Sequence, residues 1–202
     1  MQRFVAVLAA TLSLSFVSAQ PALAQPPAGE MPEALADAAP ETRAEQLDGL
    51  FDALAAARTE ASAQVIERDI LEVWLQSGSD TVDLLMEWTL EAIDAEEHAR
   101  ALDFLDRVIT LEPNYVEGWN KRATVHFMND DLAKSIADLE MVLSIEPRHF
   151  GALAGLGTIL DELDKDELAL AAYRKALELD PFMEDVQEAI DDIEKEHGGQ
   201  DI

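Results

Sequence analysis

The sequence predicts an all-α fold: a right-handed α-solenoid of repeated helix–turn–helix units, closed by a C-terminal capping helix. The first observation is a fixed period, because Pro113, Pro147 and Pro181 lie 34 residues apart, each directly after an acidic residue. The second is that each proline follows an apolar run, such as residues 108–111. Proline lacks an N–H and disfavours helix before it, so each run ends a helix. A constant period of this length is typical of stacked helix pairs.

The repeat pattern is clearest in residues 150–183. Small residues, Gly157 and Ala169, stand where the two helices of a pair approach closely, and the bulky Leu156 and Tyr173 pack against them. Residues 116–149 match this pattern partly, and residues 82–115 match it least. Period, side-chain size and proline position together resemble the tetratricopeptide repeat (TPR) family. The run 119–124 also resembles small exported bacterial repeat proteins of this kind.

The first residues have the three parts of a secretory signal peptide. A basic start at Arg3 is followed by an uncharged core, residues 4–17, and by small residues at Ala22 and Ala24. We expect cleavage after Ala24, a periplasmic location and no stable membrane insertion afterwards, because the core is too short for a comfortable spanning helix. The chain has no cysteine, which excludes disulfides and a thiol-linked lipid anchor.

The remaining chain divides at changes in composition and at the repeat boundaries. A Pro/Ala-rich linker, expected to be disordered, precedes an N-terminal helix pair that we interpret as an atypical repeat or a cap. Three repeats follow, and then a helix with one apolar and one acidic face, which suits the end of a solenoid. The expected segments are 1–24 (signal peptide), 25–40 (linker), 41–81 (helix pair), 82–115, 116–149 and 150–183 (TPR 1 to 3), and 184–202 (capping helix and frayed tail).

The charge balance restricts the partners. The chain carries 42 acidic and 14 basic residues, a net charge of −28. Phosphate recognition requires positive charge, so nucleic acid and anionic lipid are unsuitable partners. The acidic surface is explained either by solubility alone or by attraction of a basic partner.

The resemblance implies a concave groove lined by the first helix of each repeat. Carried onto this sequence, its positions are partly apolar and adaptable, which suits an extended or amphipathic peptide; the alternative is that these side chains belong to the inter-helix core. TPR domains that capture C-terminal carboxylates use lysine and asparagine there, and the equivalent positions here cannot form such a clamp. The candidate groove residues are Met86, Leu90, Asn120, Thr124, Phe127, Met128, Ala154 and Thr158.

Arg122 stands where the repeat normally places a buried leucine. A buried arginine without a partner destabilises the fold by several kcal/mol. We therefore predict an internal ion pair with Asp138 or Asp106, and the alternative is that Arg122 reaches a ligand carboxylate.

No catalytic, cofactor-binding or metal-binding residue is expected. The chain lacks a histidine pair at metal spacing, a phosphate-binding glycine loop and a nucleophile elbow. His126 occupies a packing position, and the acidic run 161–167 lacks the glycine and spacing of a calcium loop. The sequence favours a non-catalytic protein-interaction scaffold of the bacterial envelope; the alternative is a self-associating or accessory structural subunit with no groove activity.

Overall fold

The computed structural model describes residues 42–198. The chain divides into two units, residues 1–40 and 41–202, and the description below concerns the second. The expected signal peptide, the expected linker and the last four residues of the expected tail lie outside the described residues.

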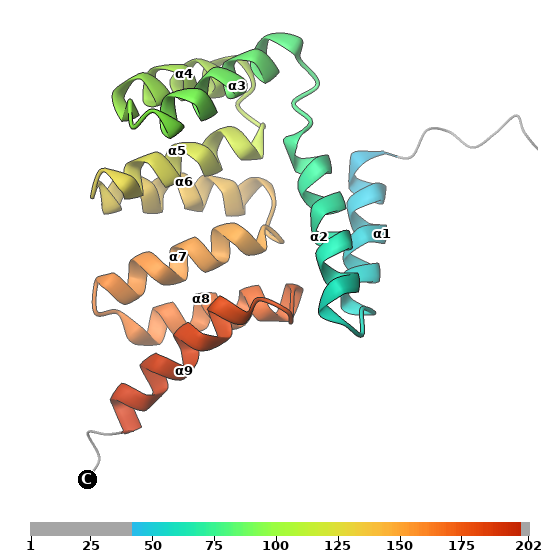
Figure 1. Ribbon diagram of the computed structural model, residues 1–202, viewed down its shortest axis with the longest axis vertical. Helices are drawn as coiled ribbons and strands as arrows, with labels where there is room; N and C mark the ends of the chain where they lie inside the picture. The colour runs from blue at the N-terminus through green and yellow to red at the C-terminus, as the bar shows by residue number, and fades with distance from the viewer. Residues whose placement is uncertain (1–41, 199–202) are drawn as a thin grey trace, which may run out of the picture. The chain divides into compact units, whose positions relative to one another are not determined.

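The described residues form nine helices and no strand, which confirms the predicted all-α solenoid. Figure 1 shows the helix pairs of the repeats stacked on one another, with the last helix below them and the first pair beside them. The helices are α1 (Arg43–Ala55), α2 (Glu60–Leu75), α3 (Asp80–Asp94), α4 (His98–Leu111), α5 (Val116–Met128), α6 (Leu132–Ile145), α7 (Phe150–Glu162), α8 (Asp166–Leu179) and α9 (Glu184–Gly198).

The stack is built from the pairs α3–α4, α5–α6 and α7–α8. Successive pairs contact each other through α4 and α5 and through α6 and α7, and α9 packs on α8 at the C-terminal end. Helix α9 buries Val186, Ile190 and Ile193 against the apolar cluster of the third repeat. A final helix with one apolar face thus covers the last repeat.

The turn inside each repeat has the same backbone conformation. Glu96, Asp130 and Asp164, 34 residues apart, all adopt positive φ angles, of 57°, 60° and 54°. The N–H of the next residue donates a hydrogen bond to a carbonyl of the preceding helix, as Glu97 does to Ala92 at 2.8 Å. This is the Schellman termination, here built without glycine.

Close contact between the helices of one pair depends on Gly157. A Cβ atom built on Gly157 would lie 2.5 Å from the ring of Tyr173, which is fully packed and 3% exposed. The bulky tyrosine on α8 therefore occupies the space that the glycine on α7 leaves.

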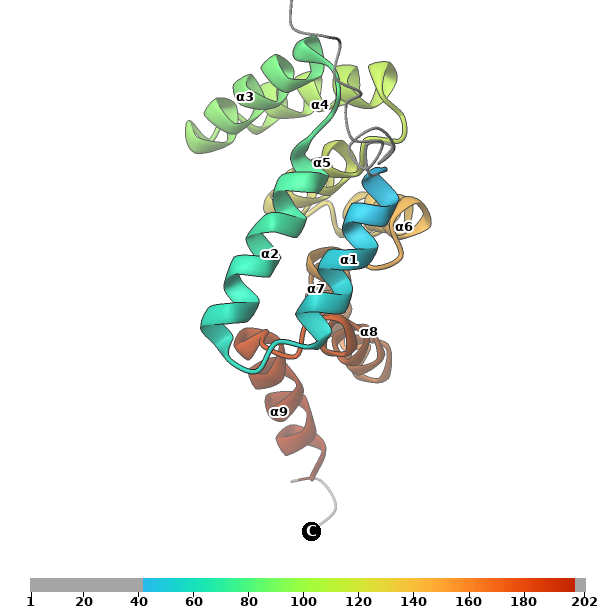
Figure 2. The same cartoon turned by 90° about the vertical axis from the view of Figure 1, so that its right-hand side faces the viewer.

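The N-terminal pair α1–α2 lies across the turns that connect the repeats (Figure 2). Tyr115 Oη donates to the carbonyl of Leu75 at 3.1 Å. The ring of His149 stacks on Trp74 at 4.1 Å, with 8° between the planes, and Met183 packs against the cluster around Trp74. Tyr115, His149 and Met183 are 34 residues apart, so the pair contacts the same position of each successive connection.

The helix pair within residues 41–81 packs along the stack, and its interpretation as an atypical repeat or cap stays a prediction. The pair contacts α5 and α8 and buries Phe51 and Trp74 against Phe150, so it forms a strut along the stack. Gly78, with φ of 78°, allows the chain to turn between the strut and α3. Apolar periodicity shows which face of a helix is buried, but it does not show against which element.

Among the described helices, none combines the length and the apolar character needed to cross a membrane.

Candidate functional site

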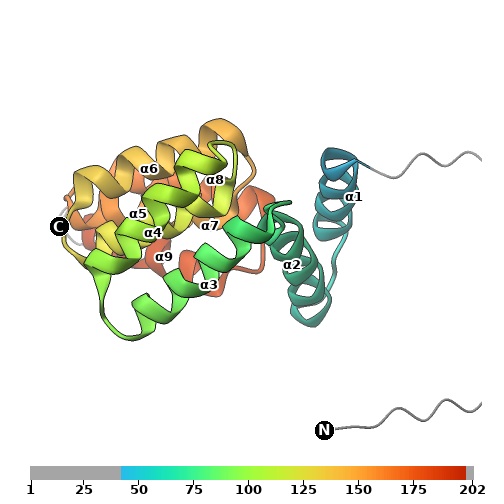
Figure 3. The ribbon, with the colours of Figure 1, turned by 90° about the horizontal axis from the view of Figure 1, so that it is seen from above.

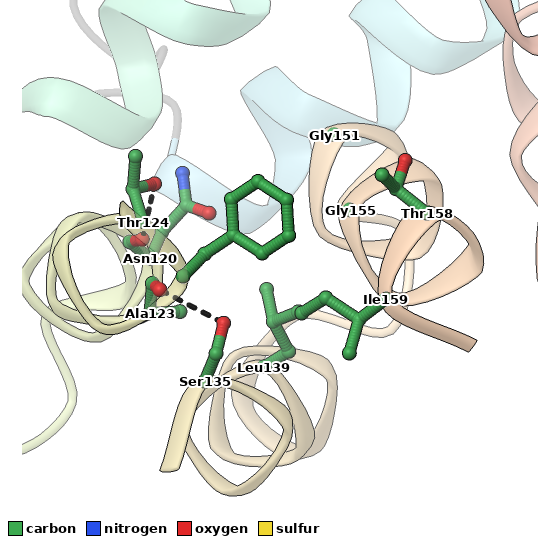
Figure 4. A pocket seen from close by; sticks show the side chains of 10 residues that line it. Asn120, Ala123, Thr124, Ser135, Leu139, Gly151, Gly155, Thr158 and Ile159 are labelled. Carbon is green, nitrogen blue, oxygen red and sulfur yellow. Dashed lines mark hydrogen bonds between the residues drawn. The ribbon is translucent and has the colours of Figure 1, made fainter. Parts of the chain in front are cut away.

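A pocket of about 180 Å³ lies between α5, α6 and α7. Figure 4 shows Asn120 and Thr124 on one side, Thr158 on the other, and Ser135 and Leu139 between them. Polar side chains thus border an opening whose floor is apolar. None of the lining residues is charged: they are Asn120, Ala123, Thr124, Phe127, Ser135, Leu139, Gly151, Gly155, Thr158 and Ile159.

Two glycines one helical turn apart keep the α7 wall open. A Cβ atom on Gly155 would lie 3.8 Å from Leu139, and one on Gly151 would lie 3.5 Å from the ring of His149. Both distances are ordinary van der Waals contacts, so neither glycine is required by packing. Their absent side chains leave the α7 backbone accessible from the pocket.

The polar side chains of the pocket use their protons internally. Thr124 donates its hydroxyl to the carbonyl of Asn120 at 3.0 Å, and Thr158 donates to the carbonyl of Ala154 at 3.2 Å. The Asn120 amide nitrogen donates to both carboxylate oxygens of Glu117, at 3.3 and 3.2 Å. The Thr124 hydroxyl oxygen and the Asn120 amide oxygen therefore remain as hydrogen-bond acceptors, while the Thr158 oxygen already accepts from Tyr173 Oη at 3.3 Å and keeps one lone pair.

Glu117, which accepts the hydrogen bonds from Asn120, is only 2% exposed. The Nδ1 atom of His149 accepts the N–H of Ala152 at 3.0 Å, so the ring proton is on Nε2, which donates to Glu117 at 3.0 Å. Burial raises the pKa of Glu117, but the hydrogen bond from His149, together with Lys121 and Asn120, outweighs it and leaves this pKa below its ordinary value. Glu117 is thus an ionised carboxylate that fixes the amide of Asn120.

Four of the eight candidate groove residues line this pocket: Asn120, Thr124, Phe127 and Thr158. Ala154 is partly buried beside the third-repeat cluster. Leu90 and Met128 are 47% and 49% exposed and do not line the pocket.

Met86 does not line this pocket, and its position agrees with the alternative that the candidate side chains belong to the inter-helix core. Met86 is 6% exposed and packs with Val82, Leu105 and Val125 in the core of the first repeats. A long, flexible apolar side chain fills such a gap well.

Sequence reasoning missed the contribution of α6 and the second glycine. Ser135 and Leu139 line the pocket from the second helix of the repeat, while the family pattern assigns only first helices to the groove. The spacing of Gly151 and Gly155 was the available signal for an open helix face.

Arg122 forms the predicted internal ion pair, with both candidate acids. Its Nε and Nη2 atoms donate to the two oxygens of Asp138 at 2.8 and 2.7 Å, and Nη1 donates to Asp106 at 2.7 Å. The guanidinium also lies 4.8 Å from the ring centroid of Trp119. The hydrogen bond to Asp138 is the main reason that the pKa of Arg122 is raised. Arg122 thus joins three helices and does not line the pocket.

His126 is a packed core histidine. It is 9% exposed, and burial lowers the pKa of its ring. Its Nδ1 atom has no hydrogen-bond partner among the described residues. Over residues 42–198 no group of three or more histidine, aspartate or glutamate side chains is arranged to hold a metal ion.

Comparison with known proteins agrees with this architecture. The tetratricopeptide repeat family model matches residues 150–183. A TPR repeat-containing protein of Rhizobium etli is 38% identical over 200 residues, which cover 98% of this chain and 97% of the relative.

Two solved structures share the fold at low identity. The first TPR of Spaghetti (RPAP3), bound to the HSP90 peptide SRMEEVD, has a TM-score of 0.57 and 19% identity over 59% of this chain and 95% of its own. MamA has a TM-score of 0.56 and 18% identity over 70% of this chain and 81% of its own. The 34-residue period, the stacked helix pairs and the relative similar over its whole length lead to one conclusion: the chain belongs to the tetratricopeptide repeat family.

Proposed function

We propose that this protein is a non-catalytic interaction module, a scaffold or adaptor that binds an extended segment of another protein in its concave groove. The observation that carries the proposal is the uncharged pocket between α5, α6 and α7, which four of the expected groove residues line.

The chemistry of the pocket favours a peptide. Extended peptides present backbone N–H groups, and the acceptors on Asn120, Thr124 and Thr158 complement them. Phe127, Leu139 and Ile159 provide an apolar floor for one side chain. A volume of about 180 Å³ is below the roughly 300–1,000 Å³ typical of small-molecule sites, so the pocket suits an anchoring side chain.

The lack of cations in the pocket makes it unsuitable for acidic peptides. The RPAP3 domain is bound to an HSP90 peptide that contains two glutamates and an aspartate. No cation lines the present pocket, and the chain carries a net charge of −28. A neutral or basic segment is the chemically matched ligand.

We place this activity in the bacterial cell envelope, in the periplasm. The support is the signal-peptide pattern of residues 1–24 and the similarity to a bacterial relative. Amino-terminal sequencing of the protein from the periplasmic fraction tests this placement, which requires Gln25 as the first residue; retention of residue 1 in the cytoplasm would contradict it.

The groove is tested by comparing partner capture from envelope extracts by the wild type and by variants. Asn120→Ala/Phe127→Ala removes an acceptor and the apolar wall, and should reduce capture of the specific partner at least tenfold. Gly155→Leu should do the same by filling the pocket, without removing any buried side chain.

Leu163→Ala/Leu168→Ala is the matched control, because these leucines are 37% and 57% exposed and lie outside the pocket. Melting temperatures establish that each variant is folded. Partner capture that is unchanged in folded Gly155→Leu would overturn the groove proposal.

A further inference from the structure

The two ends of the helix stack differ in chemistry. At the C-terminal end, α9 presents exposed Glu184, Asp185, Glu188 and Asp191. At the other end, no described helix lies beyond α3 and α4, which face the viewer in Figure 3. The strut α1–α2 runs along the side of the stack, so it leaves the outer face of α3 and α4 uncovered.

The uncovered face is apolar. Leu84, Trp88 and Leu111 are 43%, 40% and 52% exposed, and with Leu85 they border a hollow of about 440 Å³. The Trp88 ring is held by Phe104, with 5.7 Å between the ring centroids. A solenoid end normally carries a polar cap, and a cluster of exposed large apolar side chains marks an interaction surface.

One cation lines the same hollow. Arg107 is exposed and makes no hydrogen bond or ion pair within the described residues. Glu91, also exposed, follows Trp88 by one turn of α3 and is likewise unpaired there. The face therefore combines an apolar centre with unpaired charges of both signs, which is what a self-complementary surface requires.

We propose that two copies of this chain associate through their α3–α4 faces about a twofold axis, as a closed dimer. Arg107 of each copy then lies toward Glu91 on α3 of the other copy. A head-to-tail arrangement would instead place Leu84, Trp88 and Leu111 on the carboxylates of α9, and burying those charges is costly. Trp and Arg at the centre of such a face are the residue types that dominate binding energies.

The size of the face is sufficient for a specific dimer. Helix α3 has 15 residues and is therefore about 22 Å long, and two adjacent helices are about 20 Å wide, so the face covers roughly 450 Å² of flat area per copy. Side-chain relief enlarges this area, and two faces together reach the roughly 1,000 Å² that specific interfaces need.

The net charge of the chain predicts how the dimer responds to salt. Each copy carries a net charge of −28, so the copies repel each other at low ionic strength. Salt screens this repulsion and leaves the apolar contact intact. The dimer should therefore become tighter as salt increases, whereas a dimer held mainly by ion pairs would weaken.

Sedimentation velocity of the mature chain over a concentration series tests the proposal. The wild type should show a monomer–dimer equilibrium whose dissociation constant falls at least threefold between 50 and 500 mM NaCl, on the order expected when the Debye length contracts. Leu84→Glu/Leu111→Glu should raise the dissociation constant at least tenfold. Leu168→Glu, at a similarly exposed position on α8, should leave it unchanged.

Circular dichroism shows whether the variants fold, and Leu111→Glu alone carries the test if the double variant does not. Three results would overturn the proposal. One is a dimer that survives these substitutions, and another is a dimer that Leu168→Glu weakens equally. The third is a wild-type chain that stays monomeric at all concentrations; hydroxyl-radical footprinting of Trp88 then shows whether the face is covered within the same chain or open to a different protein.

Discussion

Gly157 and Gly155 lie two residues apart on α7 but play opposite parts. Gly157 is required by packing, since a Cβ there would collide with the Tyr173 ring at 2.5 Å. Gly155 faces the pocket, where a Cβ would meet only Leu139, at 3.8 Å. Within one helix, the first of these glycines is needed for packing and the second is not.

Gly157→Ala should lower the free energy of unfolding by about 1–3 kcal/mol, because the added methyl group forces Tyr173 out of its position. Gly155→Ala should instead raise it by about 0.5–1 kcal/mol, since alanine is the better helix former and space is available. Urea denaturation of both variants measures this difference. Equal effects of the two substitutions would contradict the packing described here.

The environments of single residues could be predicted from the sequence only in part. The partners of Arg122 could be predicted, because a buried cation needs a carboxylate and the repeat spacing brings few within reach. The sequence left the groove and the inter-helix core open for Met86, which is buried, because a flexible side chain at the edge of a helix face turns toward core or solvent according to its neighbours. The positive φ of Glu96, Asp130 and Asp164 left no glycine signal in the sequence.

At the scale of helices, α2 is held against the repeats by two acid-containing contacts with opposite responses to pH. The ionised Glu117 accepts a hydrogen bond from His149 beneath Trp74. Nearer the start of α2, Glu67 lies within hydrogen-bond distance of Asp180. Burial is the main cause that raises the pKa of each carboxyl group. The hydrogen bond between them raises the pKa of Glu67 further and lowers that of Asp180, so Glu67 is the member of the pair that takes up a proton first as pH falls.

The sign of the Glu67–Asp180 effect follows from linkage. A carboxyl group whose pKa is raised by folding stabilises the fold fully below its unfolded pKa of about 4, and this contribution is lost as pH rises through the raised value. Glu67→Gln keeps a hydrogen-bond donor without the charge. It should raise the melting temperature at pH 7 and have little effect near pH 4.

Thermal denaturation of the wild type and Glu67→Gln from pH 4 to pH 8 measures this dependence. Glu72→Gln is the control, since Glu72 is exposed on the same helix. A melting temperature of Glu67→Gln that falls below the wild type at pH 7 would contradict a raised pKa of Glu67 at this contact.

The helices themselves could be predicted from apolar spacing and proline positions, but the placement of the first pair could not. Residues 41–81 contain two amphipathic stretches, and the structure has helices α1 and α2 within them. Their large aromatic residues, Phe51 and Trp74, pack against Phe150, about 80–100 residues later in the chain. Contacts at that sequence separation leave no periodic signal.

At the scale of the whole molecule, the strut, the last helix and the pocket occupy different surfaces of the helix stack. The strut α1–α2 fixes the connections between repeats, α9 closes one end, and the pocket between α5, α6 and α7 stays open. The net charge of −28 disfavours acidic partners, so a neutral or basic segment is the expected ligand of the proposed groove. The sequence predicts the solenoid as a whole, whereas the division of its surfaces depends on where the strut packs.

The central claim is that a protein segment binds in this pocket. The most direct measurement is photo-crosslinking in intact cells, with a photoreactive amino acid at Thr124, in the pocket, or at Leu168, outside it. We predict a discrete crosslinked partner from Thr124 that disappears when Gly155→Leu fills the pocket, and no such product from Leu168. The same product from both positions, or one from Thr124 that persists with Gly155→Leu, would contradict the account.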